Sequence, residues 1–144
     1  MKRVRGYSLL EVLIALTIAS ILAVVAVPLY LNYDVRAKVI EGLMVAAPIE
    51  TQVTEFYQTM GRWPSSNGMA GIEPPAGYRT DYVDNINLSI GSAGTEITIT
   101  YRLAALDTHN TLIITPRRID SASTQWQCTG GTLLDKYRPP SCRS

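Results

Sequence analysis

The chain has 144 residues, of which 47% are hydrophobic and 17% charged, and its formal net charge is +1. This length allows one domain with an appended segment, and the apolar content excludes a disordered or collagen-like chain. One histidine and two cysteines are too few ligands for a Cys/His zinc site, and the near-neutral charge gives no general indication of nucleic-acid binding. A multidomain enzyme and a zinc module are therefore excluded.

The amino end combines a basic leader with a long apolar run. Residues 1–6 carry three positive charges and no acid, and residues 12–31 are twenty positions without a charge. A helix of that length reaches about 30 Å, the thickness of a bilayer's hydrocarbon core. Because the basic residues come first, we expect one membrane span with its amino end in the cytoplasm. The alternative is a cleaved signal peptide, but its apolar run is usually ~7–15 residues, and Ala23 and Ala26 lack A-x-A spacing.

Glu11 is the only charged residue between Arg5 and Asp34. A carboxylate inside a span costs about 2.5–3.5 kcal/mol on insertion scales, and such residues usually have a partner. Solvation at the level of the lipid headgroups is the alternative, because Glu11 precedes the apolar run. Position alone leaves both interpretations open.

The segment Gly6-Tyr7-Ser8-Leu9-Leu10-Glu11, between a basic leader and an apolar helix, resembles the class III leader of type IV pilins and pseudopilins. In that family a prepilin peptidase cuts after the glycine and N-methylates the new amino terminus, and the helix is retained. The resemblance implies cleavage between Gly6 and Tyr7 with methylation of Tyr7. It also implies that Glu11 pairs with the amino terminus of a neighbouring subunit, and that the helix is interrupted at Pro28.

The sequence departs from the family at Ser20, where many members have glycine, so local melting of the helix between Ser20 and Pro28 is less expected here.

Removal of residues 1–6 changes the net charge of the chain. It leaves 10 basic residues against 12 acidic ones, a formal net charge of −2.

Beyond the span, apolar residues recur at steps of three and four, which predicts an amphipathic helix with one buried stripe. The stripe consists of Val35, Val39, Leu43, Ala46, Ile49, Val53, Phe56 and Met60. We expect one rod from about Ser8 to Met60, with Pro48 kinking it or ending one helix and beginning another. Packing on a sheet of the same chain is preferred to a coiled-coil seam, because strand-like segments follow.

Residues 61–80 contain four glycines and three prolines and are predicted to form an irregular loop, with Trp63 as its packing anchor. Alternating or β-prone segments then predict strands at 83–90, 95–101, 111–115 and 124–128. A helix followed by strands without alternation indicates an α+β fold, here a long amino-terminal helix packed on a four-stranded antiparallel sheet. The family resemblance implies that this is the pilin fold.

Cys128 and Cys142 close a loop of fifteen residues. Exported chains meet oxidising conditions, so a disulfide is expected, and a loop of this length is worth about 3 kcal/mol in the chain-entropy model. The segment between them resembles the disulfide-bounded loop of type IVa major pilins. The resemblance divides the chain into a cleaved leader (1–6), a long helix (7–60) with an apolar assembly part (7–33), and a globular domain (61–144) with an αβ-loop (61–80) and a disulfide-bounded loop (128–142).

The sequence offers little for catalysis. His109, the only histidine, lies in a predicted turn without Ser or Cys neighbours, so we interpret it as solvated. Asp81, Asp84 and Asn85 could supply oxygens to calcium, as in some pseudopilins, but a solvated acidic loop is the preferred interpretation. We predict neither an enzyme nor a cofactor or metal site.

The resemblance implies a major pilin, the structural subunit of a type IV pilus, supporting adhesion, twitching motility and DNA uptake. The precursor would lie in the inner membrane with its domain in the periplasm, and the mature subunit in an extracellular homo-oligomeric filament. Its partners would be a prepilin peptidase, a platform protein and an assembly ATPase, and a host or abiotic surface could be contacted. A minor pilin is an alternative, as is a type II secretion pseudopilin, although the two cysteines argue against the latter.

A DNA-binding pilin receptor is the alternative from another class. Arg117, Arg118, Lys136 and Arg138 could contact DNA phosphates, with Tyr137 and Trp126 nearby to stack a base. A solvated basic rim on a slightly acidic subunit is the preferred interpretation.

Overall fold

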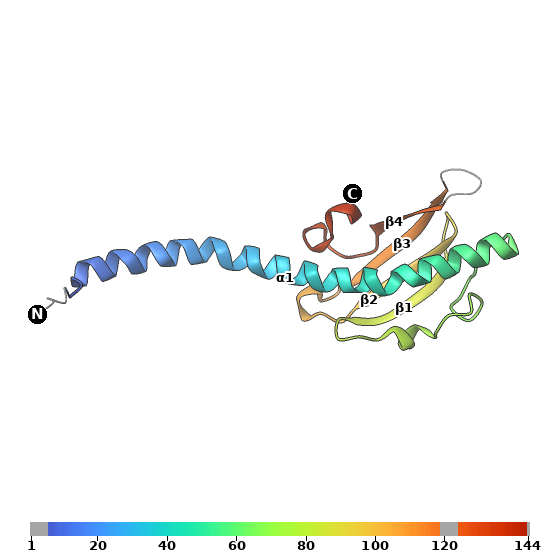
Figure 1. Cartoon of the computed structure of the whole chain (residues 1–144), viewed down its shortest axis with the longest axis horizontal. Coiled ribbons are helices and arrows are strands. Elements are labelled where there is room, and N and C mark those ends of the chain that lie inside the picture. Colours follow the sequence, from blue (N-terminus) through green and yellow to red (C-terminus); the bar gives the residue numbers. More distant parts are fainter. Residues whose placement is uncertain (1–5, 119–123, 144) are drawn as a thin grey trace, which may run out of the picture. The chain divides into compact units, whose positions relative to one another are not determined.

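Four strands form one antiparallel sheet whose spatial order is that of the sequence, β1-β2-β3-β4 (Figure 1). The computed structural model describes residues 6–118 and 124–143, and the side chain of Arg118 lies outside that description. The elements are α1 (Leu9–Met60), β1 (Val83–Ile90), β2 (Thr95–Tyr101), β3 (Thr111–Arg118) and β4 (Thr124–Gly130), with short 3-10 turns between them and near the carboxyl end. The chain divides into two units, Met1–Asp34 and Val35–Ser144, which are described separately.

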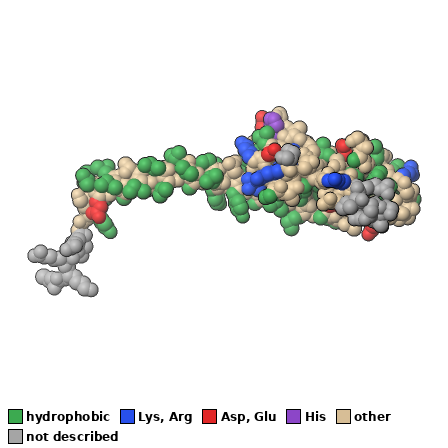
Figure 2. Space-filling view, turned by 90° about the horizontal axis from the view of Figure 1, so that it is seen from above, with side chains coloured by type: hydrophobic (Ala, Val, Ile, Leu, Met, Phe, Trp, Pro, Cys, Tyr) green, Lys and Arg blue, Asp and Glu red, His purple; other side chains and the backbone are tan. Residues whose placement is uncertain are grey.

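The first unit contains the amino-terminal half of α1. Every residue from 9 to 31 is exposed, including large apolar side chains such as Ile21 (69% exposed) and Leu22 (65%). The helix is long and apolar enough to cross a membrane. Figure 2 shows hydrophobic side chains gathered around this part of the chain.

In the second unit, the carboxyl-terminal half of α1 packs on the sheet through a stripe of buried residues. The stripe consists of Val35, Val39, Gly42, Ala46, Ile49 and Val53. At Gly42 the helix approaches the sheet so closely that an added Cβ would lie 2.6 Å from the ring of Tyr101 on β2. The Tyr101 hydroxyl donates a hydrogen bond to the carbonyl oxygen of Val39 at 2.8 Å, and burial raises the pKa of this phenol. This contact fixes the helix against the sheet at one point.

For Pro48 the structure excludes one of the two expectations, and it also changes which residues make up the buried stripe. The helix is continuous through Pro48, so no second helix begins there. Both Pro48 and Met44, whose carbonyl loses its helical donor, are exposed, so water can satisfy that oxygen. Met60 is 59% exposed, while Leu43 and Phe56 are only half-buried. Gly42 joins the stripe instead, because only a residue without a side chain fits against Tyr101.

The four-stranded α+β fold that the sequence predicts is confirmed. Strands β1 and β2 have the predicted bounds, and all four odd-numbered residues of β2 are buried. Strands β3 and β4 are longer than predicted, and Pro116 in β3 lies opposite Trp126 in β4. Proline has no N–H to donate to the hydrogen bonds of the sheet, and the predicted strand therefore ended before Pro116. The observed strand continues to Arg118.

The loop from 61 to 80 is held to the sheet by side chains. Asn67 is 3% exposed, and it donates from Nδ2 to the carbonyl oxygen of Ile86 at 3.0 Å and accepts from the Leu88 N–H at 2.8 Å. It therefore replaces a neighbouring strand along the edge of β1. Trp63 stacks on Tyr57 with ring centroids 4.1 Å apart and meets the edge of Trp126 at 6.3 Å. This agrees with its predicted role as a packing anchor.

Candidate functional site

Tyr7 lies two residues before the start of α1, and Glu11 lies in the first turn of that helix. Gly6 and Glu11 are exposed, and Tyr7 is 83% exposed. The two side chains, together with Val12, Ala15 and Leu16, line a shallow apolar groove of about 390 Å³. A carboxylate in the first turn also interacts favourably with the unpaired N–H groups of the helix end.

The polar residues inside the apolar run are satisfied within the helix. The hydroxyls of Thr17 and Ser20 each donate to a backbone carbonyl one turn earlier, at 2.8 Å. Ser20 and Pro28 both lie inside the continuous helix α1. Hydroxyls bonded in this way expose no unpaired donor to an apolar environment.

Cys128 at the end of β4 and Cys142 near the carboxyl terminus form a disulfide, with Cα atoms 4.7 Å apart. Between them the chain makes two single 3-10 turns, Asp135–Tyr137 and Pro140–Cys142. Thr132 and Thr111 exchange hydrogen bonds that tie this loop to the start of β3. The loop is thus fixed at both ends and also along its length.

Arg138 is the organising residue of the disulfide loop, and it is only 4% exposed. Its guanidinium donates to four carbonyl oxygens, those of Leu133 (2.8 Å), Cys128 (3.2 Å), Gly130 (3.0 Å) and Gly131 (3.1 Å). An ion pair with Asp135 at 3.4 Å balances its charge. A planar group with five donors is suited to a site lined by carbonyls, which explains why arginine is buried here.

The expectation that Arg138 belongs to an exposed DNA-binding rim is therefore wrong, because its donors are used inside the loop. The side chain of Arg118, a second member of that set, lies outside the described residues. Lys136 and Arg117 are exposed. Lys136 lies in the disulfide loop, which Thr132 ties to Thr111 at the start of β3, whereas Arg117 lies six residues along β3 from Thr111, or roughly 20 Å. The structure does not bring these cations together.

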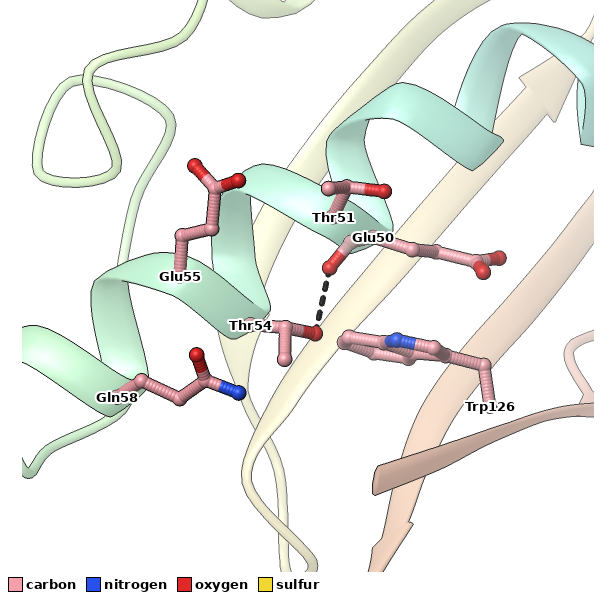
Figure 3. Close-up of a pocket in the computed structure, with 6 residues that line it drawn as sticks. All are labelled: Glu50, Thr51, Thr54, Glu55, Gln58 and Trp126. Carbon is pink, nitrogen blue, oxygen red and sulfur yellow. Dashed lines mark hydrogen bonds between the residues drawn. The ribbon is translucent and has the colours of Figure 1, made fainter. Parts of the chain in front are cut away.

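An open groove lies between the carboxyl-terminal half of α1 and strand β4 (Figure 3), with a volume of about 300 Å³. We call it the helix groove, and its lining residues are Glu50, Thr51, Thr54, Glu55, Gln58 and Trp126. Glu50, Thr54 and Gln58 are spaced by four and share a helix face, and the Thr54 hydroxyl donates to the Glu50 carbonyl at 2.7 Å. Burial raises the pKa of the Glu50 carboxyl above its ordinary value of 4.5. The groove was not predicted, because its only signal in the sequence is the spacing of four between these polar residues beside the apolar stripe.

The remaining candidates are simple surface residues. His109 is exposed in the turn before β3, and its ring lies 3.5 Å from the Thr108 hydroxyl. Asp84 pairs with Arg79 at 2.6 Å and accepts from Asn85 at 3.1 Å. The hydrogen bonds from Asn85 and Arg79 lower the pKa of Asp84. Within residues 6–118 and 124–143, no three His, Cys, Asp or Glu side chains are grouped closely enough to hold a metal ion.

Comparison with known proteins agrees with this arrangement at both ends of the chain. Residues 35–143 match a model of the pilins of bacterial filaments, and residues 1–27 match the prokaryotic N-terminal methylation motif. A type IV major pilin protein, PilE1 of Neisseria gonorrhoeae, is 38% identical over 88 residues, which cover 60% of this chain and 53% of that protein. The chain spans about half the length of this gonococcal pilin and of a second one that is also 38% identical.

Two other relatives align over most of their length. A fimbrial protein of Neisseria meningitidis serogroup B is 30% identical over 139 residues, covering 93% of this chain and 78% of that protein. The fimbrial protein EcpC of Eikenella corrodens is 30% identical over 142 residues, covering 97% of this chain and 91% of that protein. The similarity therefore includes the apolar segment, the sheet and the carboxyl-terminal loop.

Proposed function

The chain belongs to the type IV pilins, structural and non-enzymatic subunits of bacterial filaments, and from this premise we propose that it is a major pilin. The observation that carries the proposal is the fully exposed apolar surface of α1 from residue 9 to 31. That surface is stable only in a bilayer or against copies of itself. The second unit, by contrast, has a core of its own. A subunit that moves from a membrane into a helical bundle would have these two parts.

We place the precursor in the inner membrane, with the basic leader in the cytoplasm and the sheet domain in the periplasm. A prepilin peptidase would cut between Gly6 and Tyr7 and methylate Tyr7, and a platform protein and an assembly ATPase would build the extracellular filament. Both residues of the proposed cleavage site are exposed. The filament would then support adhesion to surfaces, twitching motility and DNA uptake.

An intact mass of material sheared from the surface of the source cell tests this proposal. We expect an abundant species that lacks residues 1–6, carries one added methyl group and gains two hydrogens on reduction of the Cys128–Cys142 bond. A processed chain found only in the inner membrane would instead indicate a minor pilin or a pseudopilin. A chain beginning near Val27 would contradict the proposed processing altogether.

Glu11 is proposed to pair with the ammonium of Tyr7 in a neighbouring subunit, because cleavage would place a positive charge at the end of an apolar helix. At an effective dielectric of about 20, such a pair at about 4 Å gains roughly 4 kcal/mol before desolvation is subtracted. Glu11→Ala should leave export and cleavage intact and reduce assembly. Normal filament numbers in this variant would contradict the pairing.

Pro28, which withholds one helical N–H, is proposed as the place where the helix is interrupted on assembly.

A further inference from the structure

The helix groove is suited to a positively charged side chain. Glu50 contributes a carboxylate beside the indole of Trp126, the ring that attracts cations most strongly, while Glu55 lines the groove with its carboxylate directed away from that ring. Figure 3 shows Glu50 running alongside the indole, with Thr54 and Gln58 directed to the same side of the helix. The volume of the groove, about 300 Å³, exceeds that of one lysine side chain.

No cation in the described part of the chain forms an ion pair with Glu50 or Glu55. Glu50 is half-buried, so its carboxylate has lost hydration without gaining a positive partner among the side chains that the structure describes. The raised pKa of Glu50 has burial as its cause. A cation supplied from outside would offset this loss, and the indole would provide a second attraction.

The same domain carries two exposed basic side chains at the disulfide loop, Lys136 and Arg143, beside the half-buried Arg36. Arg36 donates from Nη2 to the carbonyl of Lys136 at 2.9 Å, and Arg143 donates from Nε to the carbonyl of Arg138 at 3.2 Å. Lys136 is exposed, and its Nζ lies 4.7 Å from the centre of the Tyr137 ring. Because the disulfide and Arg138 hold the loop, little backbone entropy would be lost when Lys136 binds a partner.

These two surfaces cannot meet within one copy. Arg36 holds Lys136 near the level of residue 36 on α1, whereas the helix groove spans residues 50–58. At ~1.5 Å per residue the two levels are about 21–33 Å apart along the helix. A second copy displaced along the helix axis by that distance would bring its basic residues to the level of the groove of the first.

We propose that the Lys136 side chain of one subunit docks in the helix groove of a neighbouring subunit, between the Glu50 carboxylate and the Trp126 ring. The contact joins two different surfaces of identical chains, and such a heterologous contact repeats without closing and forms an open helical filament. The inference rests on the proposed function and adds to it a specific pair of surfaces and an axial displacement.

Carbodiimide treatment of sheared filaments tests this contact directly. The reagent takes up the water lost when a lysine ammonium and a nearby carboxylate form an amide, and residues 7–144 contain only two lysines, Lys38 and Lys136. We expect mass spectrometry to find Lys136 joined to Glu50 or Glu55 in filaments and not in detergent-dispersed subunits. Any filaments formed by Lys136→Arg, which keeps the charge without forming this amide, should lack the link.

Charge exchange provides the second measurement. Lys136→Glu should lower the yield of sheared filament about fivefold. This is the change in affinity expected when each contact between subunits loses one exposed ion pair. Adding Glu50→Lys, which exchanges the two charges of the proposed pair, should restore much of that loss, while Arg62→Gln, at an exposed residue outside the lining of the groove, should have no effect. The amount of processed subunit in the membrane shows whether each variant folds.

The outcomes separate this inference from the proposed function. Abundant wild-type filaments without a Lys136 link, together with no recovery in the charge-exchanged variant, would overturn the docking contact alone. A free organic cation found in the groove of the filament would overturn it as well. Absence of wild-type filaments from the cell surface would overturn both the contact and the proposed function.

Discussion

The two halves of α1 are one continuous helix in two different environments. From residue 9 to 31 every side chain is exposed although nearly all are apolar, whereas from Val35 to Val53 one residue in every three or four is buried. Both halves are helical and each contains one proline, Pro28 or Pro48, so the difference lies in what covers the side chains. The second half obtains its cover from the sheet of its own chain, and the first must obtain it from a bilayer or from other copies.

The largest expected effect distinguishes the two halves directly. Ile49→Ala, at a residue 1% exposed, should lower the free energy of unfolding by about 2–5 kcal/mol through lost burial and a cavity. Leu22→Ala, at a residue 65% exposed, should change it by less than about 0.5 kcal/mol. Denaturant unfolding of the processed chain in detergent, followed by the fluorescence of Trp63 and Trp126, measures both. Equal losses would mean that the apolar half belongs to the same cooperative unit.

Arg138→Met should have the next largest effect, because four carbonyl oxygens lose their charged donor. We expect a loss of about 2–3 kcal/mol in the free energy of unfolding. Arg143→Met is the matched control, since this side chain is exposed and donates only to the Arg138 carbonyl. Unfolding of the two variants in detergent checks the prediction, and a stable Arg138→Met protein would show that the loop does not depend on this residue.

Tyr101→Phe should cost about 1 kcal/mol, since it removes the hydrogen bond to the Val39 carbonyl and keeps the ring that packs on Gly42. Tyr33→Phe is its counterpart in the first half of the helix, at a tyrosine 68% exposed, where no loss is expected. Thermal unfolding followed by near-ultraviolet circular dichroism compares the two. A loss at Tyr33 as large as at Tyr101 would remove the contrast between the halves.

The smallest effect depends on pH. Burial raises the pKa of Glu50 above 4.5, so the folded state binds a proton more tightly than the unfolded state, and stability falls as the pH rises through the folded pKa. Glu50→Gln should therefore stabilise the dispersed subunit at pH 7, and the gain should vanish below pH 4.5. Unfolding of this variant and of Glu55→Gln at the two pH values makes the comparison. An equal gain in stability for Glu50→Gln at both pH values would show that the effect comes from packing and not from the charge.

The sequence predicted the regular elements well because their signals are local. The alternation of Thr95–Tyr101 places every second residue in the core, and the structure buries those residues. The effect of the two prolines was less predictable. The sequence left a helix break at Pro48 as one alternative, and β3 was predicted to end before Pro116. A proline signals the loss of a donor, but it does not show whether the affected helical carbonyl is exposed or whether the strand position needs an N–H.

The candidate sites were predicted less completely. Cys128 and Cys142 were paired correctly, since two cysteines in an exported chain leave one bond to form. Arg138 was expected on the surface because arginine usually lies there, and its four carbonyl partners come from positions 128 to 133 only after the loop has closed. The helix groove joins residues of α1 to Trp126, which lies far along the chain.

By itself the sequence determined the long apolar helix, the α+β class, the leader motif and the disulfide, because composition and spacing along the chain carry those signals. Only the tertiary structure decided that Gly42 admits Tyr101, that Asn67 covers the edge of β1 and that Arg138 lies inside its loop. Each of these depends on which distant backbone groups are left without partners after the sheet and helix pack. That information arises from contacts between segments and is not present in any one of them.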